Sequence, residues 1–167
     1  MPVIGPRALV AIVVAILLCG VSTAHAGADC SITAVNLNFG VYDSLLSVPD
    51  DSAGSITVTC NYVPPGTTTV SYTVAVSSGL NATSAETRKM AAGTALLGYN
   101  VFNDPARTAT WGNGTGGTVL VSGSTTVGPG IGNSTRKITH AVYGRLPALQ
   151  DAVPGSYLDT LLLTLMY

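Results

Sequence analysis

The stretch Gly155–Tyr167, GSYLDTLLLTLMY, decides the fold of this chain. After a turn at Pro154-Gly155, the residues of one parity are mostly apolar, whereas the other parity is mixed. This period of two is typical of a β-strand rather than a helix. We therefore predict a core strand of a sheet, which either closes with an earlier segment or leaves an open edge for a partner. The residues of its apolar parity are Tyr157, Leu161, Leu163, Leu165 and Tyr167.

The first 26 residues have the features of a secretory signal peptide. Arg7 supplies a positive charge, Ala8 to Cys19 is an unbroken apolar run of 12 residues, and Ala24-His25-Ala26 fits the small-x-small cleavage pattern. A helix of that length rises about 18 Å, less than the roughly 30 Å of a bilayer core, so a retained membrane anchor is the weaker interpretation. We expect residues 1–26 to be the signal peptide and residues 27–167 to form one exported domain.

Composition favours an all-β domain. Removal of 26 of the 167 residues leaves 141, enough for a sizeable core, with six basic and eight acidic side chains. Glu86 is the only glutamate, whereas threonine, serine, valine and glycine are abundant, so long exposed helices have little to be made from. The cations are scattered apart from Arg88-Lys89 and Arg136-Lys137, and we expect no nucleic-acid partner.

Two cysteines follow the predicted cleavage site. In an exported chain, Cys30 and Cys60 are expected to form a disulfide, since oxidising compartments favour such bonds. No further metal ligands have suitable spacing around them, and we expect neither a metal site nor a cofactor.

Short strands separated by glycine and proline loops predict a sandwich or barrel. A change of parity between Ile32 and Val35 indicates a bulge in the first strand, and Asp50 and Asp51 are expected in a polar loop. A short edge strand is expected near Met90. The main predicted strands are Cys30–Tyr42, Ser55–Tyr62, Thr69–Ser77, Ala95–Asn103, Thr118–Ser122, Arg136–Arg145 and the closing stretch.

Candidates for catalysis or ion binding are weak. His140 could join a serine and Asp159 in a triad, but His140 lies in a strand pattern and no Gly-x-Ser-x-Gly elbow is present. The segment 112–117 has no Lys-Ser/Thr after it, which favours a flexible turn over a phosphate cradle. Asp50 and Asp51 lack the spaced oxygen ligands that calcium needs. We therefore expect no enzymatic activity.

Several motifs together resemble the spore coat U domain, the pilin module of the Csu-type, or archaic, chaperone–usher pili. The resemblance covers nearly the whole chain after the signal peptide, and its combination of motifs is fairly specific. The motifs are Cys30–Ile32, Phe39–Tyr42, Ile56–Cys60, Tyr99–Asp104, Ala106–Thr108, Trp111-Gly112, Tyr143–Ala148 and Gly155–Thr160 with the apolar alternation after it.

The resemblance implies an incomplete immunoglobulin-like β-sandwich that lacks its last strand. Its implied partners are a periplasmic pilus chaperone, an outer-membrane usher and other pilin subunits, which supply a donor strand by β-augmentation. The chain would pass through the periplasm to a pilus on the cell surface. The side chains that we expect to line the acceptor groove are Leu37, Phe39, Leu161, Leu163 and Leu165.

The sequence departs from the pilin pattern before Cys30. Only Gly27–Asp29 separate the predicted cleavage site from Cys30, and three residues span about 10 Å, too little to fill a neighbour's groove. This spacing predicts a tip or minor subunit that accepts a strand without donating one. Trp111 and Asn113 could belong to a surface-binding loop, although a tryptophan that caps the sandwich is the alternative.

A self-sufficient secreted β-sandwich, which binds a ligand or coats a surface, is the competing hypothesis. It requires an internal segment that closes the sheet, for which 118–122 is the candidate.

Overall fold

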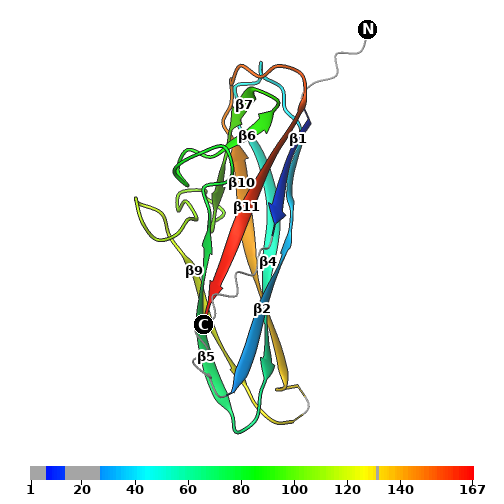
Figure 1. Ribbon diagram of the computed structural model, residues 1–167. Coiled ribbons are helices and arrows are strands. Elements are labelled where there is room, and N and C mark those ends of the chain that lie inside the picture. The colour runs from blue at the N-terminus through cyan, green and yellow to red at the C-terminus, as the bar shows by residue number, and fades with distance from the viewer. Residues whose placement is uncertain (1–6, 14–26, 131) are drawn as a thin grey trace.

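The computed structural model describes residues 7–13, 27–130 and 132–167, which form two β-sheets packed into an elongated sandwich (Figure 1). The larger sheet has the order β3-β1-β11-β5-β9, with β6 beside β11 and β7 beside β6, and the smaller sheet has the order β2-β4-β10-β8. The strands are β1 (Arg7–Val13), β2 (Ala28–Val35), β3 (Leu37–Val41), β4 (Asp50–Tyr62), β5 (Thr68–Val76), β6 (Lys89–Ala92), β7 (Ala95–Gly98), β8 (Asn100–Phe102), β9 (Val121–Val127), β10 (Thr135–Leu146) and β11 (Ser156–Met166).

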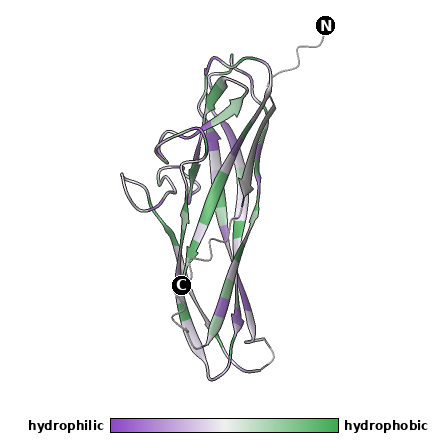
Figure 2. Cartoon of the chain, in the orientation of Figure 1, coloured by the Kyte–Doolittle hydropathy of each residue, from purple (hydrophilic) through white to green (hydrophobic). Residues whose placement is uncertain are grey.

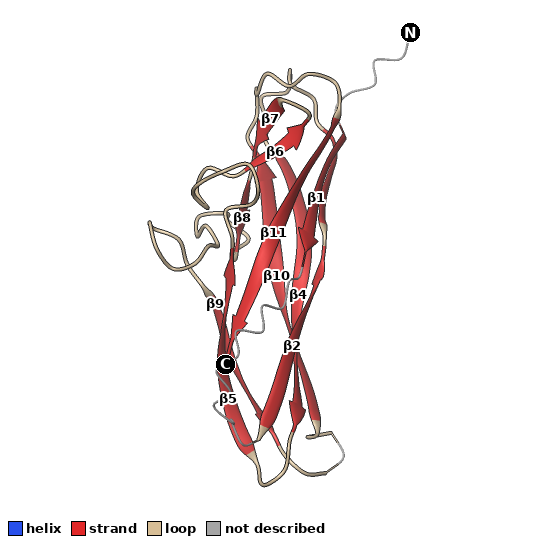
Figure 3. Cartoon of the chain, viewed as in Figure 1, coloured by secondary structure: helices blue, strands red, loops and turns tan. Residues whose placement is uncertain are grey.

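The all-β prediction is confirmed. The described residues contain strands and loops without a helix (Figure 3), and so none of them forms an apolar helix of membrane-spanning length. In β11, Tyr157, Leu161 and Leu163 are buried while Leu158 and Leu162 are exposed, as the alternation predicted. Figure 2 shows this strand as a largely hydrophobic ribbon. Because burial of one such side chain contributes about 1.5 to 3 kcal/mol, this parity fixes the face that β11 turns to the core.

The first predicted strand is two strands in different sheets. β2 pairs with β4 in the smaller sheet, and after Asn36 the chain crosses into the larger sheet as β3. The change of parity therefore marks this crossing rather than a bulge, and Val35 and Val41 are 62% and 59% exposed. Gly54 of β4 permits the crossing, because a Cβ there would lie 2.7 Å from the Val35 carbonyl oxygen.

Three other boundaries differ from the predictions. Asp50 and Asp51 begin β4 instead of lying in a loop, because they extend its ladder with β10. The predicted strand 95–103 divides at Tyr99 into β7 and β8, which lie in different sheets. The segment 118–122 contributes only its last two residues to β9. That strand pairs with β5, away from the gap it was expected to close.

The expected disulfide joins Cys30 and Cys60. These residues are direct cross-strand partners in β2 and β4, with a Cα–Cα distance of 4.1 Å. The bond thus links neighbouring strands of one sheet. It closes a loop with a sequence separation of 30 residues that contains the crossing into the larger sheet.

Removal of this disulfide is expected to lower the free energy of unfolding by about 3 to 4 kcal/mol, because the loop regains entropy in the unfolded chain. The measurement is chemical denaturation of the wild type and of the double variant Cys30→Ala/Cys60→Ala. A reductant should shift the wild-type midpoint and leave that of the double variant unchanged. Equal midpoints for the oxidised wild type and the variant would contradict the prediction.

Candidate functional site: a strand-acceptor groove

The strand between β3 and β11 comes from the predicted signal peptide. β1 pairs in parallel with β11 from Arg7↔Ser156 to Val13↔Leu162, and it pairs antiparallel with β3 over residues 37–41. Figure 1 shows β1 beside the upper half of β11, pointing in the same direction. The remainder of the predicted signal peptide, residues 1–6 and 14–26, lies outside the described residues.

Among the described strands, β1 is the only sheet partner of β3. All other strands of the larger sheet follow the predicted cleavage site. The described residues from Gly27 onward therefore leave this sheet incomplete between β3 and β11, where the backbone of both strands would lack partners on one side. We call this position the acceptor groove. It is bounded by Leu37–Val41 of β3 and Ser156–Leu162 of β11.

The expected groove residues differ in their relation to β1. Leu37 and Phe39 lie on β3 and Leu161 lies in the stretch of β11 that pairs with β1, and all three are buried with β1 in place. Leu163 and Leu165 lie beyond Leu162, where β1 ends, and pair with β5. Leu163 is buried and Leu165 is partly exposed.

The other edge of β11 is bound by this chain's own backbone and side chains. The backbone N–H of Ser77 donates to the Leu162 carbonyl at 2.9 Å, and the Leu162 N–H donates to Oγ of Ser77 at 2.9 Å. β5 pairs with Leu163–Met166, and β6 pairs with Leu158. β11 is thus held on the side away from β3, so its groove edge is available to an added strand.

A buried carboxylate, which the sequence-based prediction of the groove did not include, also holds β11. Asp159 accepts hydrogen bonds from the Tyr99 hydroxyl at 2.7 Å and from the Leu80 N–H at 2.9 Å. Burial and the bond to Asp159 raise the pKa of Tyr99, so its hydroxyl stays a donor. At φ +87°, Gly79 brings the loop close, and a Cβ there would collide with this carboxylate. The signal in the sequence was an aspartate on the apolar parity of the strand.

Arg88 organises the loop that lies against β11. Its side chain is buried and donates to the carbonyls of Ser77, Ala85 and Trp111 and to Oδ1 of Asn100, over distances of 2.7–3.0 Å. Desolvation lowers the pKa of Arg88 to about 10, with partial compensation from Tyr99 and Asp159, so the guanidinium is charged at neutral pH. Ser77, which binds Leu162, is fixed in place by two of these hydrogen bonds.

The structure does not bring His140 together with Asp159 as a catalytic triad would require, and it pairs Asp51 with arginines. Nε2 of His140 lies 2.8 Å from the Tyr72 hydroxyl, whereas Asp159 is bound by Tyr99 and the loop. Asp51 accepts two hydrogen bonds from Arg145, which together with Arg107 lower the pKa of its carboxyl. No cluster of potential metal ligands occurs within the described ranges.

Trp111 is fully buried, which corrects its assignment to a surface-binding loop. Its Nε1–H donates to the Val74 carbonyl at 2.9 Å, so the indole packs inside the sandwich and no face of it is open to a ligand. The alternative, a tryptophan that caps the core, agrees with this position.

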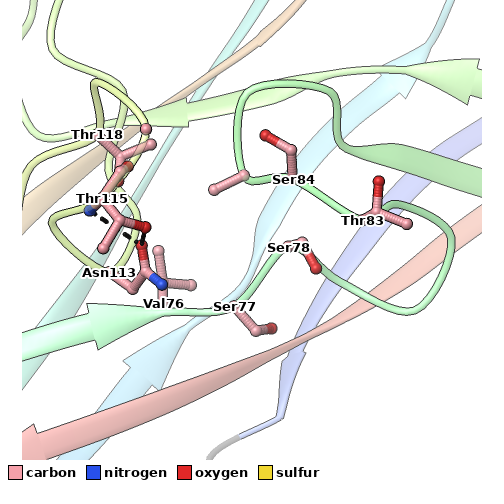
Figure 4. A pocket seen from close by; sticks show the side chains of 10 residues that line it. Val76, Ser77, Ser78, Thr83, Ser84, Asn113, Thr115 and Thr118 are labelled. Atoms are coloured by element: carbon pink, nitrogen blue, oxygen red, sulfur yellow. Dashed lines mark hydrogen bonds between the residues drawn. The ribbon is translucent and has the colours of Figure 1, made fainter.

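Asn113 lies beside a cleft of about 240 Å³ between loops 77–85 and 113–118 (Figure 4). Its Oδ1 accepts hydrogen bonds from the N–H and the hydroxyl of Thr115 at 3.1 and 2.7 Å. Most of the residues that line the cleft carry a hydroxyl or amide group, and none of them has an ionisable side chain. The cleft therefore offers neutral hydrogen bonding but no acid or base, and a binding role for Asn113 stays a prediction.

Comparison with known families agrees with this architecture. The profile of the Spore Coat Protein U domain matches residues 16–164. The chain belongs to the Spore Coat Protein U domain family. One relative of this Spore Coat Protein U domain is Protein U of Myxococcus xanthus, which is 31% identical over 155 residues, or 86% of this chain and 80% of that protein.

A solved structure shares the fold. It is the crystal structure of the CsuC–CsuE chaperone–tip adhesion subunit pre-assembly complex from archaic chaperone–usher Csu pili of Acinetobacter baumannii. The match has a TM-score of 0.52 and 24% identity and covers 84% of this chain. The same match covers 40% of the length of the chain in the solved structure.

Replacement of Arg88 tests the network behind β11. Arg88→Met should lower the free energy of unfolding of this Spore Coat Protein U domain by about 2 to 6 kcal/mol, because at least two carbonyls lose a buried donor at about 1–3 kcal/mol each. Lys89→Met is the matched control, since Lys89 is exposed and should change stability by less than about 0.5 kcal/mol. Denaturant titration measures both, and similar losses for the two variants would refute the role of Arg88.

Proposed function

We propose that this protein is a non-enzymatic structural or adhesive subunit of an archaic chaperone–usher pilus, which accepts a donor strand in the acceptor groove. The observation that carries the proposal is the place of β1, an added strand that pairs with both β3 and β11. Membership of the Spore Coat Protein U domain family and the fold shared with a chaperone–subunit complex support it.

The energetics of the groove explain why a partner is needed. If four or five apolar side chains lose their cover at about 1.5 to 3 kcal/mol each, the domain without a donor strand lacks on the order of 10 kcal/mol. Typical domains are stable by about 5 to 15 kcal/mol, so the uncomplemented chain is marginal. A periplasmic chaperone would supply the strand first, and another pilin subunit would replace it at the outer-membrane usher.

We further propose that residues 1–26 are removed on export and that the subunit occupies the tip or a minor position. β2 begins at Ala28, and Ala28 and Asp29 pair with Tyr62 and Asn61 of β4. Cleavage after Ala26 would therefore leave Gly27 alone ahead of the sheet, and a single residue cannot serve as a donor strand. N-terminal sequencing of the exported protein should begin at Gly27.

The acceptor function is tested by adding a donor in trans. A synthetic peptide of residues 5–15 should stabilise the chain 27–167 by about 2.7 kcal/mol at a hundredfold excess over its Kd, which corresponds to roughly 10 °C in Tm. The Val10→Pro peptide is the matched control, because proline removes a backbone donor from the middle of the added strand. A chain 27–167 that unfolds cooperatively at one temperature, with or without the peptide, would sink the proposal.

A second pair of variants locates the bound peptide. Leu161 is fully buried and Leu162 is 37% exposed, although the two are neighbours on β11. Leu161→Ala should weaken peptide binding at least tenfold, whereas Leu162→Ala should leave it nearly unchanged. Isothermal titration compares the two affinities, and equal effects would place the peptide elsewhere.

The competing function, a self-sufficient secreted β-sandwich, is favoured by the same strand if residues 7–13 are retained. The sheet would then be closed from within the chain, although by β1 rather than by 118–122. An exported protein that still contains Arg7 and ignores added donor peptide would support this alternative.

A further inference from the structure

We propose that the cleft between loops 77–85 and 113–118 binds one neutral sugar residue of a glycan (Figure 4). This loop cleft lies beyond the edge of β11 that faces away from the acceptor groove, because Ser77, which lines it, binds Leu162 on that edge. The inference rests on the adhesive part of the proposed function, to which it gives a site and a class of ligand.

The first argument is that one buried side chain fixes the spacing of the two walls. Arg88 donates to the carbonyls of Ser77 and Ala85 in one wall and to the carbonyl of Trp111, which leads into the other wall, over 2.8–3.0 Å. The loop cleft is therefore shaped by contacts within the protein. A ligand that enters it is spared the cost of ordering two loops.

The second argument is that polar groups of both walls are left for a ligand. Oδ1 of Asn113 accepts two hydrogen bonds from Thr115, and its side-chain NH2 group has no acceptor among the described residues. The Thr83 hydroxyl makes no hydrogen bond within the described ranges either. The Ser84 hydroxyl accepts from the Glu86 N–H at 3.1 Å and keeps its own proton to donate. Figure 4 shows Asn113 and Thr115 on one wall and Thr83 and Ser84 on the other, so a ligand meets donors and acceptors from two sides.

The third argument is the charge of the site. None of the lining residues is ionisable, and Arg88 donates all its guanidinium hydrogens to protein oxygens. The Glu86 carboxylate lies beside the second wall, since a Cβ on Gly117 would be 3.1 Å from its Oε1. That carboxylate repels an anion, whereas a cation would find no counter-charge among the lining side chains. The loop cleft thus favours a neutral ligand that exchanges hydrogen bonds.

The fourth argument is size. The volume of about 240 Å³ is below the roughly 300–1,000 Å³ of pockets for drug-sized ligands. At about 30 Å³ each, on the order of eight water molecules would fill it, which is the scale of one six-membered sugar ring. Val76 and Ala85 add small apolar surfaces for the C–H groups of such a ring, while its hydroxyls donate and accept as the walls do. A single neutral sugar residue therefore fits the loop cleft.

The test uses the exported protein, folded with its disulfide, in the presence of the synthetic peptide of residues 5–15. The probes are the methyl glycosides of glucose, galactose, mannose and N-acetylglucosamine. Methyl glucuronide and N-acetylglycinamide serve as the anionic and the peptide-like comparison. In a heteronuclear NMR titration, at least one methyl glycoside should bind with a Kd on the order of 1 mM and shift the amide signals of Thr83, Ser84 and Asn113.

Matched variants locate the bound sugar. Asn113→Asp keeps an acceptor for Thr115 but replaces the NH2 group by an oxygen, and it should lower the affinity about tenfold or more. Asn133→Asp is the control, because it places the same charge on an exposed residue of another loop and should leave the affinity unchanged. Thr83→Val removes a hydroxyl from the opposite wall at nearly constant shape and should lower the affinity roughly two- to tenfold. If Asn113→Asp does not fold, Thr83→Val decides.

Three results would overturn the inference. These are no binding of any methyl glycoside, equally tight binding of methyl glucuronide or N-acetylglycinamide, and an affinity that neither cleft variant changes. The affinity for the donor peptide, measured on the same samples, separates this inference from the acceptor function. A protein that binds the peptide but no glycoside loses only the sugar site, whereas one that binds a glycoside but no peptide loses only the acceptor function.

Discussion

The structure depends on one constraint, which is that the backbone of β3 and the upper part of β11 must be paired on the edges that face each other. These strands do not pair with one another, since β1 lies between them. Their N–H and C=O groups need hydrogen-bond partners from a third strand, and their apolar side chains need a cover. The origin of that strand decides whether the domain is self-sufficient or depends on a partner.

The rest of the sandwich holds β11 in place on the side away from the acceptor groove. β11 is fastened on its other side by β5, by β6 and by the reciprocal bonds between Ser77 and Leu162. The carboxylate of Asp159 and the guanidinium of Arg88 are buried with several hydrogen bonds each, and they hold the loop that presents Ser77. Buried polar groups with all partners in place rigidify a site. The β11 side of the groove is therefore held by contacts that do not involve β1.

This Spore Coat Protein U domain combines a two-sheet sandwich, a disulfide between neighbouring strands and a crossing of the chain from one sheet to the other. In this chain β1 lies between β3 and β11.

Alternation along the sequence determined most of the fold. It identified the buried face of β11, because a period of two places every second side chain toward the core irrespective of the neighbouring strands. The exported compartment predicted the pairing of Cys30 with Cys60. Three of the expected groove residues, Leu37, Phe39 and Leu161, lie in the segments that pair with β1 or between those paired positions.

The tertiary structure alone decided which sheet each strand joins. The chain changes sheets after Val35 and again at Tyr99, and a change of parity in the sequence does not distinguish such a crossing from a bulge. The burial of Trp111 and Arg88 could likewise not be predicted from the sequence, because they donate to backbone carbonyls of segments that are distant along the chain. The sequence by itself determined that the chain closes on an apolar core strand, which needs a neighbouring strand either from an earlier segment or from a partner. Only the three-dimensional arrangement placed Arg7–Val13 beside it, since pairing between residues about 150 positions apart leaves no local pattern.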